Sequence, residues 1–146
     1  MTDAAALADQ LRTGAQALAP QLAAAARREQ HRHSPLEAAV LARLDSGSAA
    51  TSAEIARLEG VTAQAVSTAV AALSAAGLVT AAPDPDDHRR RRLALTAEGR
   101  GAAGPIRDAK NAWLAERLAA LTPAERAALT DALSALRRVA AAADHA

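Results

Sequence analysis

The chain has 146 residues, a formal net charge of +1 and no cysteine. This length suits about one domain with a sizeable core, and the missing cysteines exclude disulfides and thiolate metal sites. Tyr and Phe are absent and Trp113 is the one aromatic residue, which excludes an aromatic platform for single-stranded nucleic acid but leaves duplex DNA open.

Apolar runs in this sequence are short. None approaches the roughly 20 residues of a membrane span, and the N-terminal residues lack a signal-peptide pattern. We therefore expect a cytoplasmic protein with no membrane partner. Because the net charge is close to zero, a nucleic-acid site would need a local concentration of cations. Residues 89–92, four consecutive arginines, provide one.

The first predicted element is an amphipathic helix. Leucines recur at positions 7, 11, 18 and 22, a spacing that places them on one helix face. Pro20 lies inside this pattern, and we expect it to kink or divide the helix, because a mid-helix proline removes a hydrogen bond and clashes with the previous turn. The leucine face needs a partner to cover it.

Further along the chain, four hydroxyl residues predict helix starts. Three of them begin a capping box, with glutamate three residues later: Ser34, Thr51 and Thr122. The fourth, Thr62, follows the tripeptide E-G-V, and Gly77 ends its helix. A short helix at about 52–58 and a longer one at about 62–75 are thus joined by three residues that include glycine, which predicts a helix-turn-helix.

The pattern changes from helix to strand after Gly77. The segments 78–80 and 93–96 flank a turn region rich in aspartate and proline, which predicts a β-hairpin. A helix-turn-helix followed directly by a hairpin is the element order of a winged helix. The arginine run lies on the returning strand, at the tip of this wing.

Two long helices are expected after the wing, over residues 97–121 and 123–143, because apolar residues recur there at helical spacing. Trp113 fits core or interface packing. We interpret residues 1–33 and 100–146 as a helical dimerisation region and residues 34–99 as a winged helix-turn-helix DNA-binding domain. The expected fold class is mainly α with a small β-hairpin wing.

Candidate DNA contacts on the second helix of the helix-turn-helix are polar residues on one arc of an alanine-rich helix. Gln64, Ser67 and Thr68 can bond base edges or phosphates. Thr62 is interpreted as a cap whose amide end also faces a phosphate. The alternative for all four residues is an ordinary solvent-exposed helix face with no role in binding.

The wing supplies the cationic candidates Arg89, Arg90 and Arg91. Arg89 is expected to enter a minor groove, where narrow A·T-rich stretches concentrate negative potential. Asp87 is expected to structure the wing by holding Arg89 or the wing backbone; the alternative is an ordinary turn aspartate.

The sequence resembles the MarR-type winged-helix transcriptional regulators. The wing carries the pattern D-x-R-x-x-x-L-x-L-T-x-x-G, preceded by LSAAGLV and IARLEGVTAQAVSTAVAAL, and its fixed positions are Asp87, Arg89, Leu93, Leu95, Thr96 and Gly99. The resemblance implies a homodimer that binds a palindromic operator in double-stranded DNA. It places the recognition helix in the major groove and the wing arginine in the minor groove, and it favours a repressor.

The same resemblance implies a pocket for a small-molecule effector where the dimerisation helices meet the winged helix. Leu, Ala and Val would line it, with Arg27, Arg28, His31 and His33 as candidate polar handles. Such a lining suits a small apolar anion. The absence of Tyr and Phe argues against an aromatic cage.

Two other classes of function fit the sequence less well. A winged-helix module for protein interaction, with a degenerate DNA face, stays open because Thr68 and Ala72 stand where the family often carries arginine. An enzyme is disfavoured, since no nucleophile–base pair or glycine-rich phosphate loop is present. His31, His33 and His88 lack carboxylate or cysteine partners at ligand spacing, so we expect no metal and no other cofactor.

Overall fold

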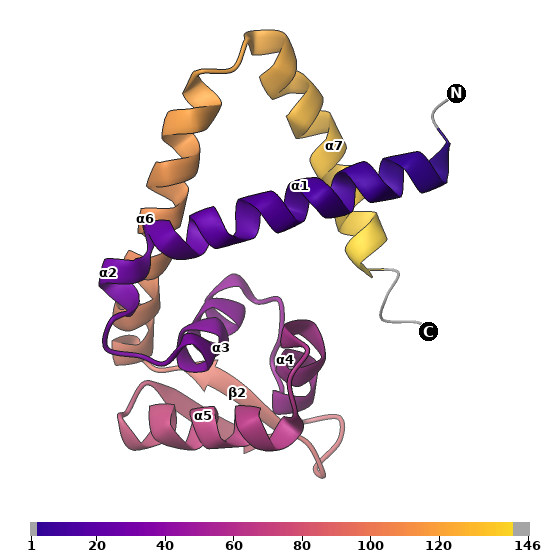
Figure 1. Cartoon of the computed structure of the whole chain (residues 1–146). Helices are drawn as coiled ribbons and strands as arrows, with labels where there is room; N and C mark the ends of the chain where they lie inside the picture. Colours follow the sequence, from indigo (N-terminus) through magenta and orange to yellow (C-terminus); the bar gives the residue numbers. More distant parts are fainter. Residues whose placement is uncertain (1–2, 142–146) are drawn as a thin grey trace. The chain divides into compact units, whose positions relative to one another are not determined.

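The computed structural model describes residues 3–141, and the chain divides into two compact units at Lys110. None of the helices within residues 3–141 has the length and apolar character needed to cross a bilayer. Figure 1 shows the elements in chain order: α1 (Ala4–Ala25), α2 (Arg27–Gln30), α3 (Pro35–Ser46), α4 (Ser52–Glu59), α5 (Ala63–Ala75), β1 (Val79–Pro83), β2 (Arg91–Leu95), α6 (Ala97–Ala119) and α7 (Pro123–Ala141). The expected fold class, mainly helical with a two-stranded antiparallel wing, is confirmed.

Helix α1 runs unbroken through Pro20, so of the two expected outcomes, a kink or a division, division of the helix is ruled out. The residues around it are mostly alanine, leucine and glutamine, which are strong helix formers, and they carry the helix past the one lost hydrogen bond. The break comes at Ala26, which is fully buried. No residue of α1 is buried, and Leu7, Leu11 and Leu18 are 42–54% exposed.

All four predicted helix caps form. Ser34 and Thr51 make complete capping boxes with Glu37 and Glu54. The hydroxyl of Thr122 accepts a hydrogen bond from the amide of Glu125, whose carboxylate accepts one from the Thr122 amide. The hydroxyl of Thr62 accepts from the Ala65 amide at 3.1 Å. These local contacts fix where α3, α4, α5 and α7 begin.

The helix-turn-helix consists of α4, a short turn and α5. Gly60 ends α4 with a left-handed backbone, φ 66°, and Gly77 has φ 75° after α5. Glycine adopts this conformation without the steric penalty that a Cβ brings. Both predicted helices therefore lie within two residues of their expected bounds.

The wing is an antiparallel pair in which Val79 faces Leu95 and Pro83 faces Arg91. Its second strand is also tied to the helical part, because the Leu93 amide donates to the Ala50 carbonyl at 2.7 Å. The arginine run is divided: Arg91 and Arg92 belong to β2, whereas residues 89 and 90 precede it in the loop.

One apolar core joins the helix-turn-helix to the wing and the start of α6. Its largest fully buried members include Leu41 from α3, Ile55 from α4 and Leu73 from α5. Val79 and Leu93 contribute from the two strands, each under a tenth exposed. The core thus fixes the positions of α5 and the wing within the first unit.

The second unit comprises the end of α6 and all of α7. The Arg117 guanidinium lies 3.8 Å from the centre of the Trp113 ring. Helix α7 has no buried residue, and its apolar face is 38–66% exposed at Leu129, Leu133, Leu136 and Val139. The expected end of this helix at residue 143 lies outside the described residues.

Candidate nucleic-acid interface

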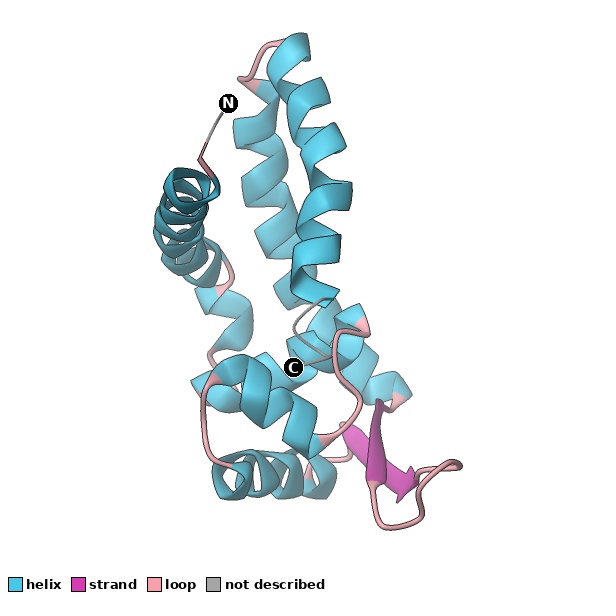
Figure 2. Cartoon of the chain, turned by 90° about the vertical axis from the view of Figure 1, so that its right-hand side faces the viewer, coloured by secondary structure: helices cyan, strands magenta, loops and turns pink. Residues whose placement is uncertain are grey.

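Helix α5 is anchored by one face and presents the other. Val66, Ala69 and Leu73 are buried in the core, whereas Gln64, Ser67 and Thr68 are exposed. Figures 1 and 2 both show α5 and the wing tip at the same end of the first unit. The structure therefore brings the exposed helix α5 and the arginine loop to one end of the first unit.

Two polar side chains of α5 differ in what they can offer to a ligand. The Thr68 hydroxyl donates its hydrogen to the Gln64 carbonyl at 3.0 Å, which leaves the oxygen as an acceptor. The Gln64 side-chain amide makes no hydrogen bond within residues 3–141, so its donor and its acceptor are both available. An amide with this freedom can pair bidentately with adenine.

The N-terminus of α5 is a candidate phosphate contact. Thr62 uses its hydroxyl to cap the Ala65 amide, and its carbonyl accepts from Val66. The amides of Ala63 and Gln64 have no acceptor within residues 3–141. Unsatisfied amides at a helix N-terminus carry partial positive charge and favour an anion.

Aspartates close the turn at the wing tip. The Asp87 carboxylate accepts from the Arg89 amide at 3.0 Å, and its carbonyl accepts from the Arg90 amide at 2.9 Å. Asp84 accepts from the Asp86 amide, and this hydrogen bond is the main reason that the pKa of Asp84 lies below its ordinary value. The acids of the wing therefore shape its backbone.

The arginines at the wing tip have different surroundings. Arg91 donates to the Ala81 carbonyl across the hairpin at 2.9 Å. Arg90 lies 3.9 Å from the Glu54 carboxylate. The Arg89 guanidinium is exposed and has no hydrogen bond or ion pair within the described part of the chain. Arg89 thus has the fewest internal contacts of the three to exchange for a DNA contact.

A compact junction holds the wing base against α5 and α6. The Thr96 amide donates to the Leu78 carbonyl at 3.0 Å, and its hydroxyl donates to Gly77 and accepts from the Gly99 amide. A Cβ on Gly99 would lie 1.9 Å from the Leu78 carbonyl oxygen. The L-T-x-x-G part of the wing pattern is therefore structural: Thr96 and Gly99 hold the base of the wing against the backbone of Gly77 and Leu78.

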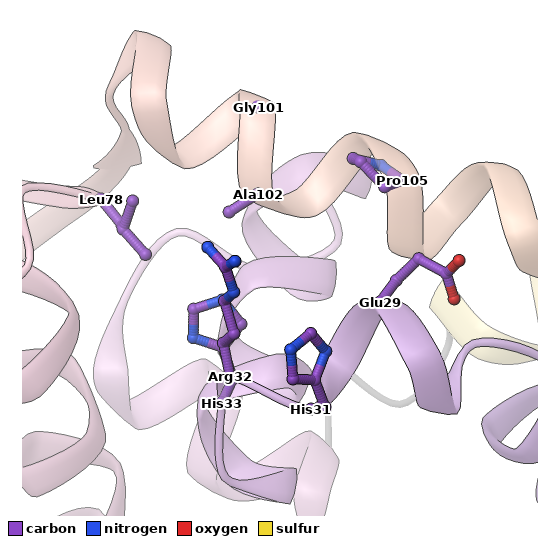
Figure 3. Close-up of a pocket in the computed structure, with 8 residues that line it drawn as sticks. All are labelled: Glu29, His31, Arg32, His33, Leu78, Gly101, Ala102 and Pro105. Carbon is purple, nitrogen blue, oxygen red and sulfur yellow. The ribbon is translucent and has the colours of Figure 1, made fainter.

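An open cleft of about 370 Å³ lies where the segment after α2 faces the start of α6. Figure 3 shows the side chains of His31, Arg32 and His33 beneath Gly101 and Ala102 of α6. Its remaining lining residues are Glu29, Leu78 and Pro105. The expected handles His31 and His33 are brought together here, and Arg32 and Glu29 join them without having been expected.

The other two expected handles lie elsewhere. Arg27 and Arg28 line a second, more open hollow together with Ala24 and His31. His31 therefore belongs to both the hollow and the cleft. His33 Nδ1 is 3.7 Å from the Glu37 carboxylate, a neighbour that the sequence did not lead us to expect. Within residues 3–141, no group of three His, Asp or Glu side chains gathers in a way that could hold a metal ion.

Comparison with known proteins gives a consistent set of similarities. Residues 34–90 match the family model described as MarR family. The crystal structure of the MarR family protein RV2887 from Mycobacterium tuberculosis is 30% identical, with 92% of this chain and 96% of that chain covered and a TM-score of 0.58. The same protein in complex with p-aminosalicylic acid is 28% identical over 89% and 97% of the two chains, with a TM-score of 0.67.

A further structure, RV1404 from Mycobacterium tuberculosis, has a TM-score of 0.72 at 24% identity, with 97% of this chain and 96% of that chain covered, and supports the fold alone. The comparison with curated proteins found no match.

Proposed function

Because the chain belongs to the MarR family of winged-helix transcriptional regulators, we propose that it acts as a homodimeric, sequence-specific repressor on a palindromic operator. Regulators of this family bind DNA and are not enzymes. In this proposal residues 34–99 form the DNA-binding domain, and residues 1–33 and 100–146 form the dimerisation region.

The observation that carries the proposal is the shared exposure of α5 and the wing. Gln64, Ser67 and Thr68 face solvent from a helix whose other side is buried. Arg89 lies exposed at the wing tip without an internal partner for its side chain within residues 3–141. In our proposal α5 reads base edges in the major groove and Arg89 enters the minor groove, while Asp87 holds the wing turn.

Dimerisation is supported by apolar faces that the described chain leaves uncovered. Leu7, Leu11 and Leu18 on α1 are exposed, as are Leu129 and Leu133 on α7. Leucines repeated along one helix face bury readily against a second copy. A twofold-symmetric dimer would present two α5 helices to two half-sites, which is why we expect a palindromic operator.

Relief by a small ligand is supported by the cleft between the α2–α3 segment and α6. Its cationic and imidazole side chains, Arg32, His31 and His33, lie beside the apolar atoms of Leu78 and Ala102, which suits a small apolar carboxylate. RV2887 was crystallised in complex with p-aminosalicylic acid. A true effector must bind more weakly in the presence of operator, by the same factor by which it weakens operator binding.

A second candidate, a winged-helix module for protein interaction, is favoured by one observation. Residues 51–99 contain five arginines and six acids, whereas phosphate neutralisation supplies most of the non-specific affinity of a DNA-binding protein. Binding to a protein partner with no salt-dependent binding to duplex DNA would favour this candidate.

Selection of bound duplexes from a random DNA library tests the proposal. We expect enrichment of a twofold-symmetric sequence whose half-sites are about one helical turn apart. Recovery of unenriched DNA would contradict a sequence-specific regulator.

A further inference from the structure

Glu54 links the helix-turn-helix to the wing tip. It occupies the third position of α4, where its Oε2 atom accepts from the amides of Ala50 at 2.7 Å and Thr51 at 3.1 Å. Its other carboxylate oxygen, Oε1, lies 3.9 Å from the Arg90 guanidinium. The capping bonds hold the carboxylate in place, so Glu54 loses little side-chain freedom when it pairs with Arg90.

The wing tip keeps its shape without this ion pair. The Arg90 amide donates to the Asp87 carbonyl and the Arg90 carbonyl accepts from the Asp84 amide, both at 2.9 Å. The Leu93 amide is tied to the Ala50 carbonyl. Because these bonds fix the backbone, the ion pair mainly affects the position of the Arg90 guanidinium.

This pair can be exchanged for a DNA contact. The side chains of Arg90 and Glu54 are 51% and 37% exposed, and exposed ion pairs are weak. A guanidinium donates bidentately to phosphate as readily as to carboxylate. Backbone donation from Ala50 is the largest cause that lowers the pKa of Glu54, so the carboxylate stays ionised at neutral pH and remains a competitor.

We propose that Glu54 competes with DNA phosphate for the Arg90 guanidinium, so that Arg90 adds less to DNA affinity than its neighbour Arg89. The inference rests on the proposed DNA-binding function and assigns Glu54 the role of an internal limit on it. Within the arginine run, Arg89 is then ready for a DNA contact, whereas Arg90 is partly neutralised.

Titration of a fluorescent duplex at several salt concentrations, with variants at both positions, tests the competition. We expect Glu54→Gln to tighten binding about two- to fivefold per half-site, the size of an exposed ion pair. The slope of log affinity against log salt should steepen by about 0.9 per half-site, one added phosphate contact. In the Arg90→Ala background, Glu54→Gln should lose most of this gain.

Two control variants separate competition from simpler effects. Asp86→Asn removes a charge from the wing tip at a carboxylate with no hydrogen bond or ion pair within residues 3–141, so it reports the general electrostatic field. Glu125→Gln changes the same capping position at the start of α7, where no arginine of the described chain pairs with the acid. It therefore reports the effect of the cap on thermal unfolding.

An equal gain from Glu54→Gln with and without Arg90, or one no larger than that of Asp86→Asn, would overturn the competition. Weaker DNA binding by a Glu54→Gln variant that unfolds like Glu125→Gln would overturn it too, in favour of a positioning role. These outcomes leave the proposed function intact. A wild-type chain that binds no duplex at any salt concentration would refute both.

Discussion

Replacing Gly99 by alanine should disturb the junction between α5, the wing and α6. The new Cβ would lie 1.9 Å from the Leu78 carbonyl oxygen and 2.9 Å from its carbon, well inside van der Waals contact. Both atoms belong to the backbone, so a side-chain rotation cannot relieve the clash. The Leu78 carbonyl would have to move, and it accepts the hydrogen bond from the Thr96 amide.

The size of the effect follows from three contributions. Overpacking costs about 1–3 kcal/mol, and a lost hydrogen bond costs about 0.5–1.5 kcal/mol. Alanine in a helix gains back about 1 kcal/mol over glycine. Together they lower the free energy of unfolding by about 0.5–3.5 kcal/mol. We expect DNA affinity to fall as well, because the wing leaves the core at this junction.

Gly101 provides a matched control in the same helix. A Cβ at this position meets nothing within 4 Å, so Gly101→Ala should leave stability unchanged or raise it by up to about 1 kcal/mol. Urea unfolding of both variants at one fixed protein concentration measures the difference. If Gly99→Ala proves as stable as Gly101→Ala, the steric account of this junction is wrong.

Three other predictions concern the preferred DNA bases, dimerisation and the pH dependence of unfolding. Gln64→Ala and Thr68→Ala should change the preferred bases in a library selection more than the overall affinity; unchanged preferences would move specificity to the wing and DNA shape. Leu133→Asp should turn a micromolar dimer into a monomer in sedimentation, because its exposed side chain lies on the apolar face of α7; a monomeric wild type would contradict the dimer. The pKa of Glu54 is lowered in the folded state, so the ionised carboxylate adds to the free energy of unfolding. This contribution is complete at pH values above the ordinary pKa of 4.5 and is lost as the pH falls through the lowered pKa. Acid unfolding of Glu54→Gln should therefore depend less on pH than that of the wild type, and parallel curves would contradict this.

Local signals predicted the elements of this fold well, because they act within one helical turn. The hydroxyl caps and their glutamates determine helix starts through backbone bonds that need no tertiary contact. Pro20 shows the limit of such signals, since the surrounding helix formers carry α1 through it. A proline predicts the lost hydrogen bond, but it does not predict whether the neighbouring turns tolerate the loss.

The residues of the candidate site stay predictions, and their surroundings depend on tertiary contacts that no local sequence signal gives. The four consecutive arginines at 89–92 look equivalent in the sequence. It does not predict that Arg90 pairs with Glu54 of α4 or that Arg91 donates a hydrogen bond across the hairpin. The family resemblance singles out Gly99, but the reason that glycine is needed there, the close approach of the Leu78 carbonyl, depends on tertiary structure. Arg32 lines the cleft because the segment after α2 faces the start of α6, a tertiary contact that the sequence does not show.

The salt dependence of duplex binding, compared between the wild type and Arg89→Ala, tests the central claim most directly. We expect wild-type log affinity to fall linearly with log salt. The slope should become shallower by about 0.9 for each wing that loses Arg89, close to two for a dimer. Affinity should drop by about 1–3 kcal/mol per half-site. The claim that the wing binds DNA through Arg89 would be contradicted by an affinity that does not change with salt concentration. An Arg89→Ala variant with the affinity and salt slope of the wild type would contradict it too.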